Sequence, residues 1–329
     1  MLKTARMRTH LALAAAVLGL GGCQATVTSD SREAVPLEVT SGPATFTAEP
    51  GPKPAGRFYA VIGGDTSNDN RLYELRFSPP DLRLLNETRR VSSVGACPNR
   101  VVVAAGQPEV GYSDHLQELR GDELGPLEGL GLQAGFNPEL DQRCRAAYTW
   151  VDRDTELLDY ELRVWEPGQK TARTWFRTRP GDGSLISPDW GPDGEVAVVR
   201  LDPKHSGQRP AGTPPGPPAA VIVVRPDGSS SEIALGGDPG VLSWGTRWLA
   251  VMERTTGTEG TIFIDPETGA RSVLKGWHPL AWSPGGDQLP VNDATEGGTV
   301  GIVEATDLSS VKAVGRMSGP VYDIVWLPA

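Results

Sequence analysis

The chain has 329 residues, of which 38% are hydrophobic and 22% charged, and its formal net charge is -10 at pH 7. An acidic protein repels phosphate backbones, so this balance argues against nucleic acid as a partner. The four histidines are scattered along the chain, so a metal or acid/base site built on clustered imidazoles is not expected.

Residues 1–22 are typical of an export signal, with a basic head before the short apolar run Leu11–Leu20. A run of this length is too short for a permanent transmembrane helix. It ends in Leu20-Gly21-Gly22-Cys23, which resembles a bacterial lipobox. The resemblance implies a diacylglyceryl group on the Cys23 thiol and cleavage directly before it. An ordinary signal peptide, in which Cys23 is incidental, is the alternative.

Residues 23–56 are rich in Ser, Thr, Pro, Ala and Gly, which predicts a flexible tether. Gln24 stands where some lipoproteins carry the Asp that retains them at the inner membrane, so the choice of membrane stays open. We expect an exported protein that is lipid-anchored on the extracytoplasmic side of a bacterial membrane.

The remaining segment, 57–329, repeats a phrase in which a strand ends in Trp and a tight turn leads to a second strand. The clearest copies are Trp190-Gly191-Pro192-Asp193-Gly194 and Trp282-Ser283-Pro284-Gly285-Gly286, and Trp244-Gly245 and Trp326-Leu327 are shorter ones. Such a repeat is typical of a β-propeller, in which one blade takes about 40–45 residues. Residues 57–327 therefore have room for six blades.

We predict an all-β, six-bladed propeller with four-stranded blades. The expected ranges for the second to sixth blades are Val91–Leu127, Leu132–Arg177, Ser184–Leu235, Val241–Leu274 and Leu280–Val314. The first blade would hold Phe58–Ile62, Leu72–Phe77 and Leu82–Asn86, and its fourth strand would be Val321–Leu327 from the other end of the chain. Pairing of the two ends removes the free sheet edges. A two-sheet sandwich is the competing fold.

The phrases at Trp190 and Trp282, followed by apolar strands, resemble the W-S-P-D-G-x-x-L-A repeat of TolB-like (WD40-like) propellers. Thr261–Gly269 is similar to the next strand and turn of that repeat. The resemblance covers roughly residues 57–329 and is faint in the second and third blades. It implies a six-bladed propeller outside the cytoplasm and leaves the activity open.

Lipidation of Cys23 would leave Cys97 and Cys144 as an even pair, and such pairs are usually bridged in an oxidising compartment. Two small buried thiols are the alternative. Trp190, Trp244, Trp282 and Trp326 recur at one strand position, which predicts packing between blades rather than a carbohydrate platform.

Asp65, Ser67 and Asp69 alternate like the start of a calcium loop, but Asn70 stands where the loop needs Gly, and Arg76 stands where it needs Glu. A polar hairpin loop without an ion is the more ordinary interpretation, and we expect no cofactor.

Loops between the second and third strands of propeller blades share one face with the connections between blades. In this chain these loops are rich in acidic residues, and the candidate binding face comprises Asp65, Asp69, Asp152, Asp154 and Glu156. Such a face would contact a partner or a cationic ligand, or it would be a solvated acidic rim.

Two functions compete at this point. The first is a monomeric, membrane-tethered propeller that binds another envelope protein or polymer, and it needs no catalytic residue. The alternative is a carboxylate- or metal-dependent hydrolase or lyase with its site at the mouth of the central channel. That enzyme would need carboxyl groups of shifted pKa around the channel, which the sequence does not place.

Overall fold

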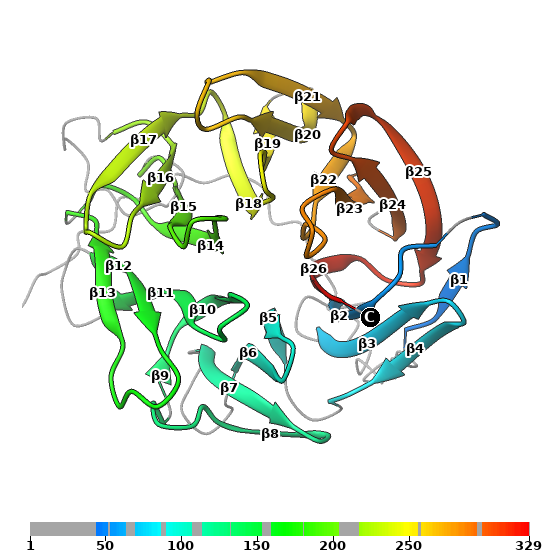
Figure 1. Ribbon diagram of the computed structural model, residues 1–329, viewed down its shortest axis with the longest axis horizontal. Coiled ribbons are helices and arrows are strands. Elements are labelled where there is room, and N and C mark those ends of the chain that lie inside the picture. The colour runs from blue at the N-terminus through cyan, green and yellow to red at the C-terminus, as the bar shows by residue number, and fades with distance from the viewer. Residues whose placement is uncertain are drawn as a thin grey trace, which may run out of the picture. The chain divides into compact units, whose positions relative to one another are not determined.

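The computed structural model describes residues 44–51, 53–63, 70–86, 90–106, 114–131, 133–152, 159–179, 181–203, 217–255, 258–294 and 298–328. They belong to one compact unit, Ser41–Ala329. Within these ranges there are strands and turns, and no helix long and apolar enough to cross a membrane. The strands form six antiparallel sheets, which Figure 1 shows as blades of a ring.

In every blade one strand lies nearest the axis of the ring, and the strands of a blade are counted outward from it (Figure 1). In blade I this first strand is β26, the last strand of the chain. Blade I contains β26 (Val321–Leu327), β2 (Arg57–Ile62), β3 (Arg71–Phe77) and β4 (Pro80–Leu84). Blade II contains β5 (Val91–Cys97), β6 (Arg100–Gly106), β7 (Asp114–Arg120) and β8 (Glu123–Pro126). Blade III contains β10 (Phe136–Leu140), β11 (Ala146–Asp152), β12 (Asp159–Trp165) and β13 (Arg173–Arg177).

Blade IV contains β14 (Leu185–Trp190), β15 (Val196–Arg200), β16 (Ala220–Val224) and β17 (Ser230–Ala234). Blade V contains β18 (Asp238–Trp244), β19 (Leu249–Thr255), β20 (Thr258–Ile264) and β21 (Arg271–Lys275). Blade VI contains β22 (Trp277–Pro279), β23 (Gln288–Asp293), β24 (Thr299–Glu304) and β25 (Asp307–Met317), followed by β1 (Phe46–Ala48).

The predicted closure of the ring by the two ends of the chain is confirmed. β26 pairs with β2 from Arg57 opposite Leu327 to Ile62 opposite Val321. Phe58 and Trp326 face each other in this ladder, and their ring centroids lie 4.7 Å apart. The closing strand therefore contributes to the apolar core between blades VI and I as well as to the sheet.

The fold begins earlier than the expected boundary at Arg57. Phe46–Ala48, inside the range assigned to the tether, form β1 and pair with β25 as a fifth strand of blade VI. A three-residue strand has too few positions to show an alternating pattern, and what holds it is tertiary packing: the Phe46 ring contacts the Phe77 ring of blade I edge-on at 5.3 Å. Residues 1–43 lie outside the described residues.

Three blade starts also differ from expectation, and the fifth blade begins at Asp238 rather than Val241. The third blade begins at Phe136 rather than Leu132, because Gln133–Ala134 (β9) pair with β7 of blade II. The sixth blade begins at Trp277 rather than Leu280. Pro290 in β23 has no N–H to donate, so the ladder between β22 and β23 weakens beside Leu280, whose N–H still donates to the Pro290 carbonyl.

The second and third strands that have continuous apolar sequences are buried on both faces, as predicted. β15 and β16 are buried along their whole length, and their side chains fill the interfaces with blades III and V. The apolar clusters between successive blades hold the ring together.

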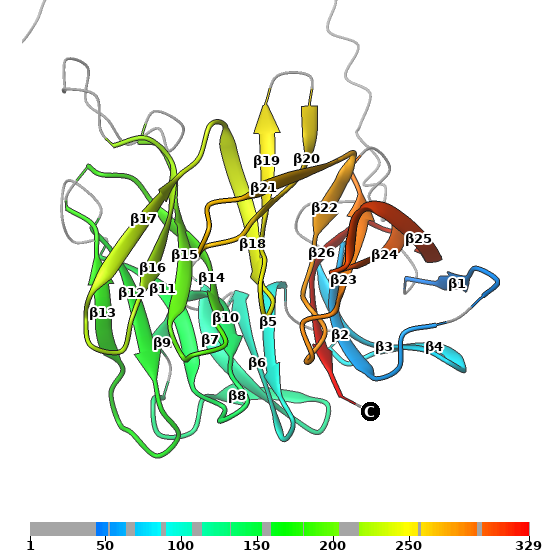
Figure 2. The same ribbon diagram turned by 45° about the horizontal axis from the view of Figure 1, so that its top comes forward.

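Alternation of strand direction gives the ring two faces. The connection face carries the blade-to-blade connections and the loops between second and third strands. The hairpin face carries the turns between first and second strands and those between third and fourth strands. In Figure 2 the C-terminal end of β26, which belongs to the hairpin face, lies at the lower edge.

Candidate functional site: the inner strands and their carboxyl groups

The innermost strands bring three carboxyl groups under one another's influence. Glu139 lies in β10, Asp189 in β14 and Asp323 in β26, and each residue is partly exposed. The charges of Asp189 and Asp323 both act on Glu139, and that of Asp189 acts on Asp323. We call these three residues the inner carboxyl cluster.

A bulge in the backbone precedes two of these residues, Glu139 and Asp189, and sets the direction of their side chains. Asn137 and Ser187 adopt left-handed conformations, with φ of 49° and 47°, and each is followed by a proline and then by the acidic residue. Both positions interrupt the register between the first and second strands of their blade. A bulge of this kind turns the side chains that follow it, so Glu139 and Asp189 occupy equivalent positions in blades III and IV.

The surroundings of the cluster favour the protonated forms. Burial among the inner strands raises the pKa of Asp189 to about 7 and the pKa of Asp323 to about 7. Burial, together with the two neighbouring aspartates, raises the pKa of Glu139 well above its ordinary value. Near neutral pH the cluster therefore holds protons that carboxyl groups in water would have lost.

Asp189 and Asp323 are both occupied in joining blades. Asp189 accepts hydrogen bonds from the backbone N–H groups of Trp190, at 2.7 Å, and of Trp244 in blade V. Asp323 accepts the N–H of Ile324 at 2.9 Å and that of Val94 in blade II at 2.8 Å. The inner strand has no further strand on its axial side, so its free N–H groups need such acceptors.

At two other junctions a serine hydroxyl accepts a backbone N–H group of the next blade. The Ser93 hydroxyl accepts the N–H of Asn137 in blade III at 3.1 Å, and the Ser243 hydroxyl accepts the N–H of Trp282 in blade VI at 3.1 Å. The Ser243 hydroxyl also donates to Asp189, which links blades IV, V and VI in one chain of hydrogen bonds. Asp189, Asp323, Ser93 and Ser243 thus form side-chain bridges between successive blades.

Glu139 differs from the two aspartates. Among the described residues no group donates a hydrogen bond to its carboxyl group, while its backbone carbonyl accepts the indole N–H of Trp190 at 3.1 Å. Within the described part of the chain, Glu139 thus differs from Asp189 and Asp323, whose carboxyl groups accept hydrogen bonds. No set of three or more His, Cys, Asp or Glu residues within the described ranges is arranged to hold a metal ion.

The repeated Trp residues pack between blades, as predicted. The Trp282 indole N–H donates to the Ser243 carbonyl at 3.2 Å, and a Cβ on Gly245 would lie only 2.8 Å from the Trp282 ring. In the same way, a Cβ on Gly191 would lie 2.8 Å from the Trp244 ring. Gly191 and Gly245, which follow Trp190 and Trp244, therefore make room for the Trp of the next blade.

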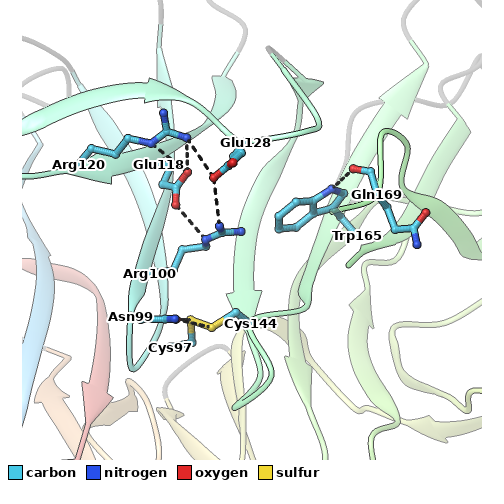
Figure 3. A network of polar contacts seen from close by, with 9 residues as sticks. All are labelled: Cys97, Asn99, Arg100, Glu118, Arg120, Glu128, Cys144, Trp165 and Gln169. Carbon is cyan, nitrogen blue, oxygen red and sulfur yellow. Dashed lines mark hydrogen bonds and ion pairs between the residues drawn. A yellow bond between two sulfur atoms is a disulfide. The ribbon is translucent and has the colours of Figure 1, made fainter. Parts of the chain in front are cut away.

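The predicted disulfide between Cys97 and Cys144 is present, with Cα atoms 5.4 Å apart. Figure 3 shows it at the junction of blades II and III, beside Asn99, whose Oδ1 lies 2.9 Å from the Cys144 sulfur. Cys97 ends β5 and Cys144 lies in the loop before β11, so the bond ties together two turns of the hairpin face. It adds a covalent link to a junction that Ser93 already bridges.

A buried ion-pair network lies on the same junction (Figure 3). Glu118 in β7 is nearly buried and pairs with Arg100 at 2.9 Å and Arg120 at 2.8 Å, while the Arg100 guanidinium lies 5.2 Å from the Trp165 ring centroid of blade III. Two cations around one buried carboxylate offset its desolvation, which is otherwise costly.

The same pattern recurs in the third strands of three blades, and the sequence reasoning missed it. Glu74-Leu75-Arg76, Glu118-Leu119-Arg120 and Glu161-Leu162-Arg163 repeat the letters E-L-R at about one blade length. In each case the Glu pairs with the Arg two residues on, because alternate residues of a strand lie on one face. This repeat identifies blades I–III, where the Trp phrase is faint.

Most residues of the predicted acidic face fall outside the described part of the chain. This holds for Asp65, Asp69, Asp154 and Glu156. Ser67 of the calcium-like loop and the lipidation candidate Cys23 also lie outside the described residues. Asp152 is the last residue of β11 and stands opposite Asp159, the first residue of β12. The inner carboxyl cluster was also missed, although Asn137-Pro138-Glu139 and Ser187-Pro188-Asp189 share a pattern that marks it.

The chain matches no family model and no curated protein. Among solved structures it is similar to TolB from Acinetobacter baumannii, with a TM-score of 0.60 and 14% identity over 83% of this chain and 67% of that one. A putative TolB from Agrobacterium tumefaciens gives a TM-score of 0.54 with 13% identity over 84% of this chain and 100% of that one. A chain of a nidogen/laminin complex gives 0.55 with 15% identity over 82% of this chain and 97% of that one. The chain thus has the six-bladed propeller fold of TolB.

Proposed function

We propose that this protein is an extracytoplasmic binding propeller, tethered to a bacterial membrane through lipid on Cys23. Its partner would be another envelope protein or polymer, and the protein itself would be a monomer. The lipobox-like sequence supports the anchor, and the disulfide supports an oxidising compartment. The fold binds a protein in at least one similar structure, since nidogen is in complex with laminin.

The proposal rests on the hydrogen bonds that the inner carboxyl groups accept from neighbouring blades. Asp189 and Asp323 each accept N–H groups of two blades. Hydrogen bonds of these carboxyl groups hold neighbouring blades together, as do those of the Ser93 and Ser243 hydroxyls. Such a ring is a rigid support whose loops and turns are left to bind.

The enzyme alternative rests on one residue. Glu139 has a raised pKa, no hydrogen-bond donor among the described residues, and two acidic neighbours, which are features of a general acid. A second reactive group beside it is still required for hydrolysis or elimination, and Asp189 and Asp323 are already engaged. The structure supports the binding function better for this reason.

Cross-linking on intact cells tests the proposal. The anchored protein is compared with a Cys23→Ala form and with a form carrying Lys at Asp65, Asp69, Asp152 and Asp154. A binding propeller recovers a defined set of neighbours, Cys23→Ala loses membrane attachment, and the charge reversal removes the neighbours if the acidic face is the docking site. A Glu139→Gln form keeps all neighbours. An absence of specific neighbours from the anchored wild type contradicts the proposal.

A further inference from the structure

The N-terminal segment crosses the outer edge of the ring from one face to the other. At its start, the Thr45 N–H donates to the Ser318 hydroxyl at 2.9 Å, and the Ser318 N–H donates to the Thr45 carbonyl at 3.0 Å. Ser318 lies in the connection from β25 to β26, so Thr45 is at the connection face. At its end, Arg57 pairs with Leu327 at the hairpin face. We call residues 44–56 the strap.

The strap is fastened to both blades of the closing junction. On blade VI, β1 pairs with Gly315–Met317, and the Lys53 ammonium donates to the Val314 carbonyl at 2.7 Å. On blade I, the Ala44 N–H donates to the Tyr73 hydroxyl at 3.1 Å, and the Trp326 indole donates to the Ala55 carbonyl at 2.9 Å. These contacts hold the strap in one course across the edge.

The position of the strap decides where an anchored chain would leave the propeller. With the strap seated, the chain leaves at Ala44, on the connection face, and residues 24–43 separate it from Cys23. With the strap released, the chain leaves at Arg57, on the hairpin face.

We propose that the strap sets which face of the propeller is turned toward the membrane. Seated, it points the connection face, which carries the predicted acidic face, at the membrane and presents the hairpin face, with its disulfide, to partners; the acidic face would be presented to partners only with the strap released. Released, it moves the attachment to the opposite face and turns the propeller over. The proposal rests on the lipid anchoring of Cys23 under the proposed function, and it names the face that is presented.

Energy transfer from the propeller to a labelled bilayer measures this orientation. Residues 23–329 are coupled through Cys23 to a maleimide lipid in phosphatidylcholine vesicles that carry an acceptor dye on their headgroups. The donor dye is attached to an azido amino acid in place of Tyr322, on the connection face, or of Asp193, in the exposed turn of the hairpin face between β14 and β15. Cys97 and Cys144 stay in their disulfide and do not compete for coupling.

The strap is released by Gly315→Val. A Cβ at Gly315 would overlap the Phe46 ring and would lie 2.8 Å from the Thr47 backbone carbonyl, so the ring must move and β1 must shift away from β25. The matched control is Gly125→Val in the outermost strand of blade II, where a Cβ would meet nothing within 4 Å. Phe46→Ser, which removes the ring contact with Phe77, is a second way to release the strap.

In the wild type and the control, the donor at position 322 is expected to transfer more energy than the donor at 193. In Gly315→Val and Phe46→Ser this difference is lost or reversed. Greater transfer from 193 in the wild type, or a difference unchanged in both released variants, overturns the inference. Because coupling to the vesicle is chemical, a missing lipid anchor in cells contradicts the proposed function and leaves this result standing.

Discussion

The Asp323 carboxylate accepts the backbone N–H of Val94 at 2.8 Å, and this contact joins the closing strand of the chain to the first strand of blade II. The ring closure between β26 and β2 is in this way tied to the next blade. Because the same carboxyl group has a pKa raised to about 7, the contact links the stability of the ring to pH.

Thermal stability should rise as the pH falls from 8 to 5. The pKa values of Asp189 and Asp323 are about 7 in the folded ring, and the ordinary Asp value, 3.8, applies once they are exposed. Between these values the folded state binds protons that the unfolded state does not, so acid stabilises the fold. This contribution is complete below about pH 4 and is lost as the pH rises through about 7.

Thermal unfolding measured at several pH values checks this prediction. The double variant Asp189→Asn/Asp323→Asn is the control, because its amide groups do not titrate and its profile between pH 5 and 8 should be flatter. The raised pKa values are contradicted if the melting temperature of the wild type falls on acidification over this range and the variant shows the same fall.

Asp323→Ala and Asp323→Asn should differ in stability at pH 8. Alanine leaves the Val94 and Ile324 N–H groups without their acceptor, which costs about 1–3 kcal/mol for an unsatisfied buried group. Val94 and Ile324 donate to different carboxyl oxygens, so asparagine keeps an acceptor for only one of them and sets its NH2 group against the other. It also removes a charge that is poorly tolerated there, so its loss of stability should be smaller than that of alanine. Urea unfolding at pH 8 measures both; equal losses of unfolding free energy would show that the hydrogen bonds do not matter.

Removal of the disulfide in Cys97→Ala/Cys144→Ala should lower the free energy of unfolding by about 4 kcal/mol. The bond closes a loop with a sequence separation of 47, and closing a loop of this size restricts the unfolded chain by about that amount. The comparison is made by urea unfolding of the oxidised wild type, the reduced wild type and the variant. A wild type no more stable when oxidised than when reduced contradicts the prediction.

Gly245→Ala should destabilise the ring by about 1–3 kcal/mol, because its new methyl group would meet the Trp282 ring at 2.8 Å in a packed junction. Gly125→Ala, at an open position in an outermost strand, serves as the matched control and should have little effect. Equal melting temperatures for the two variants would show that the Trp ring has room to move.

The sequence predicts those parts of this fold that depend on repeated local patterns. The Trp phrases place blades IV–VI, and the apolar strand Val321–Leu327 predicts the closure, because both patterns follow directly from how strands pack. The pairing of Cys97 and Cys144 was predicted because these two of the three cysteines remain once Cys23 is assigned to lipid. The E-L-R repeat was equally visible and would have placed blades I–III.

The remaining features depend on contacts between distant parts of the chain. Phe46–Ala48 form a strand because the Phe46 ring packs against Phe77 and Gly315. No local sequence pattern predicts these contacts. Glu139 and Asp189 reach the inner cluster through left-handed residues at Asn137 and Ser187, and neither residue type marks such a bulge by itself. The convergence of Glu139, Asp189 and Asp323 from three blades follows from the closed ring alone.

The course of the strap across the closing junction is open to a direct chemical measurement. Thr47 and Arg316 stand opposite each other between β1 and β25, and both residues are exposed. The variant Thr47→Cys/Arg316→Cys, made with Cys23→Ala, should form a second disulfide within one molecule, and mass spectrometry of the unreduced peptides should link positions 47 and 316. If Cys97–Cys144 forms in that protein while positions 47 and 316 stay unlinked, or link only between molecules, the strap does not lie along β25 and the closing junction is built differently.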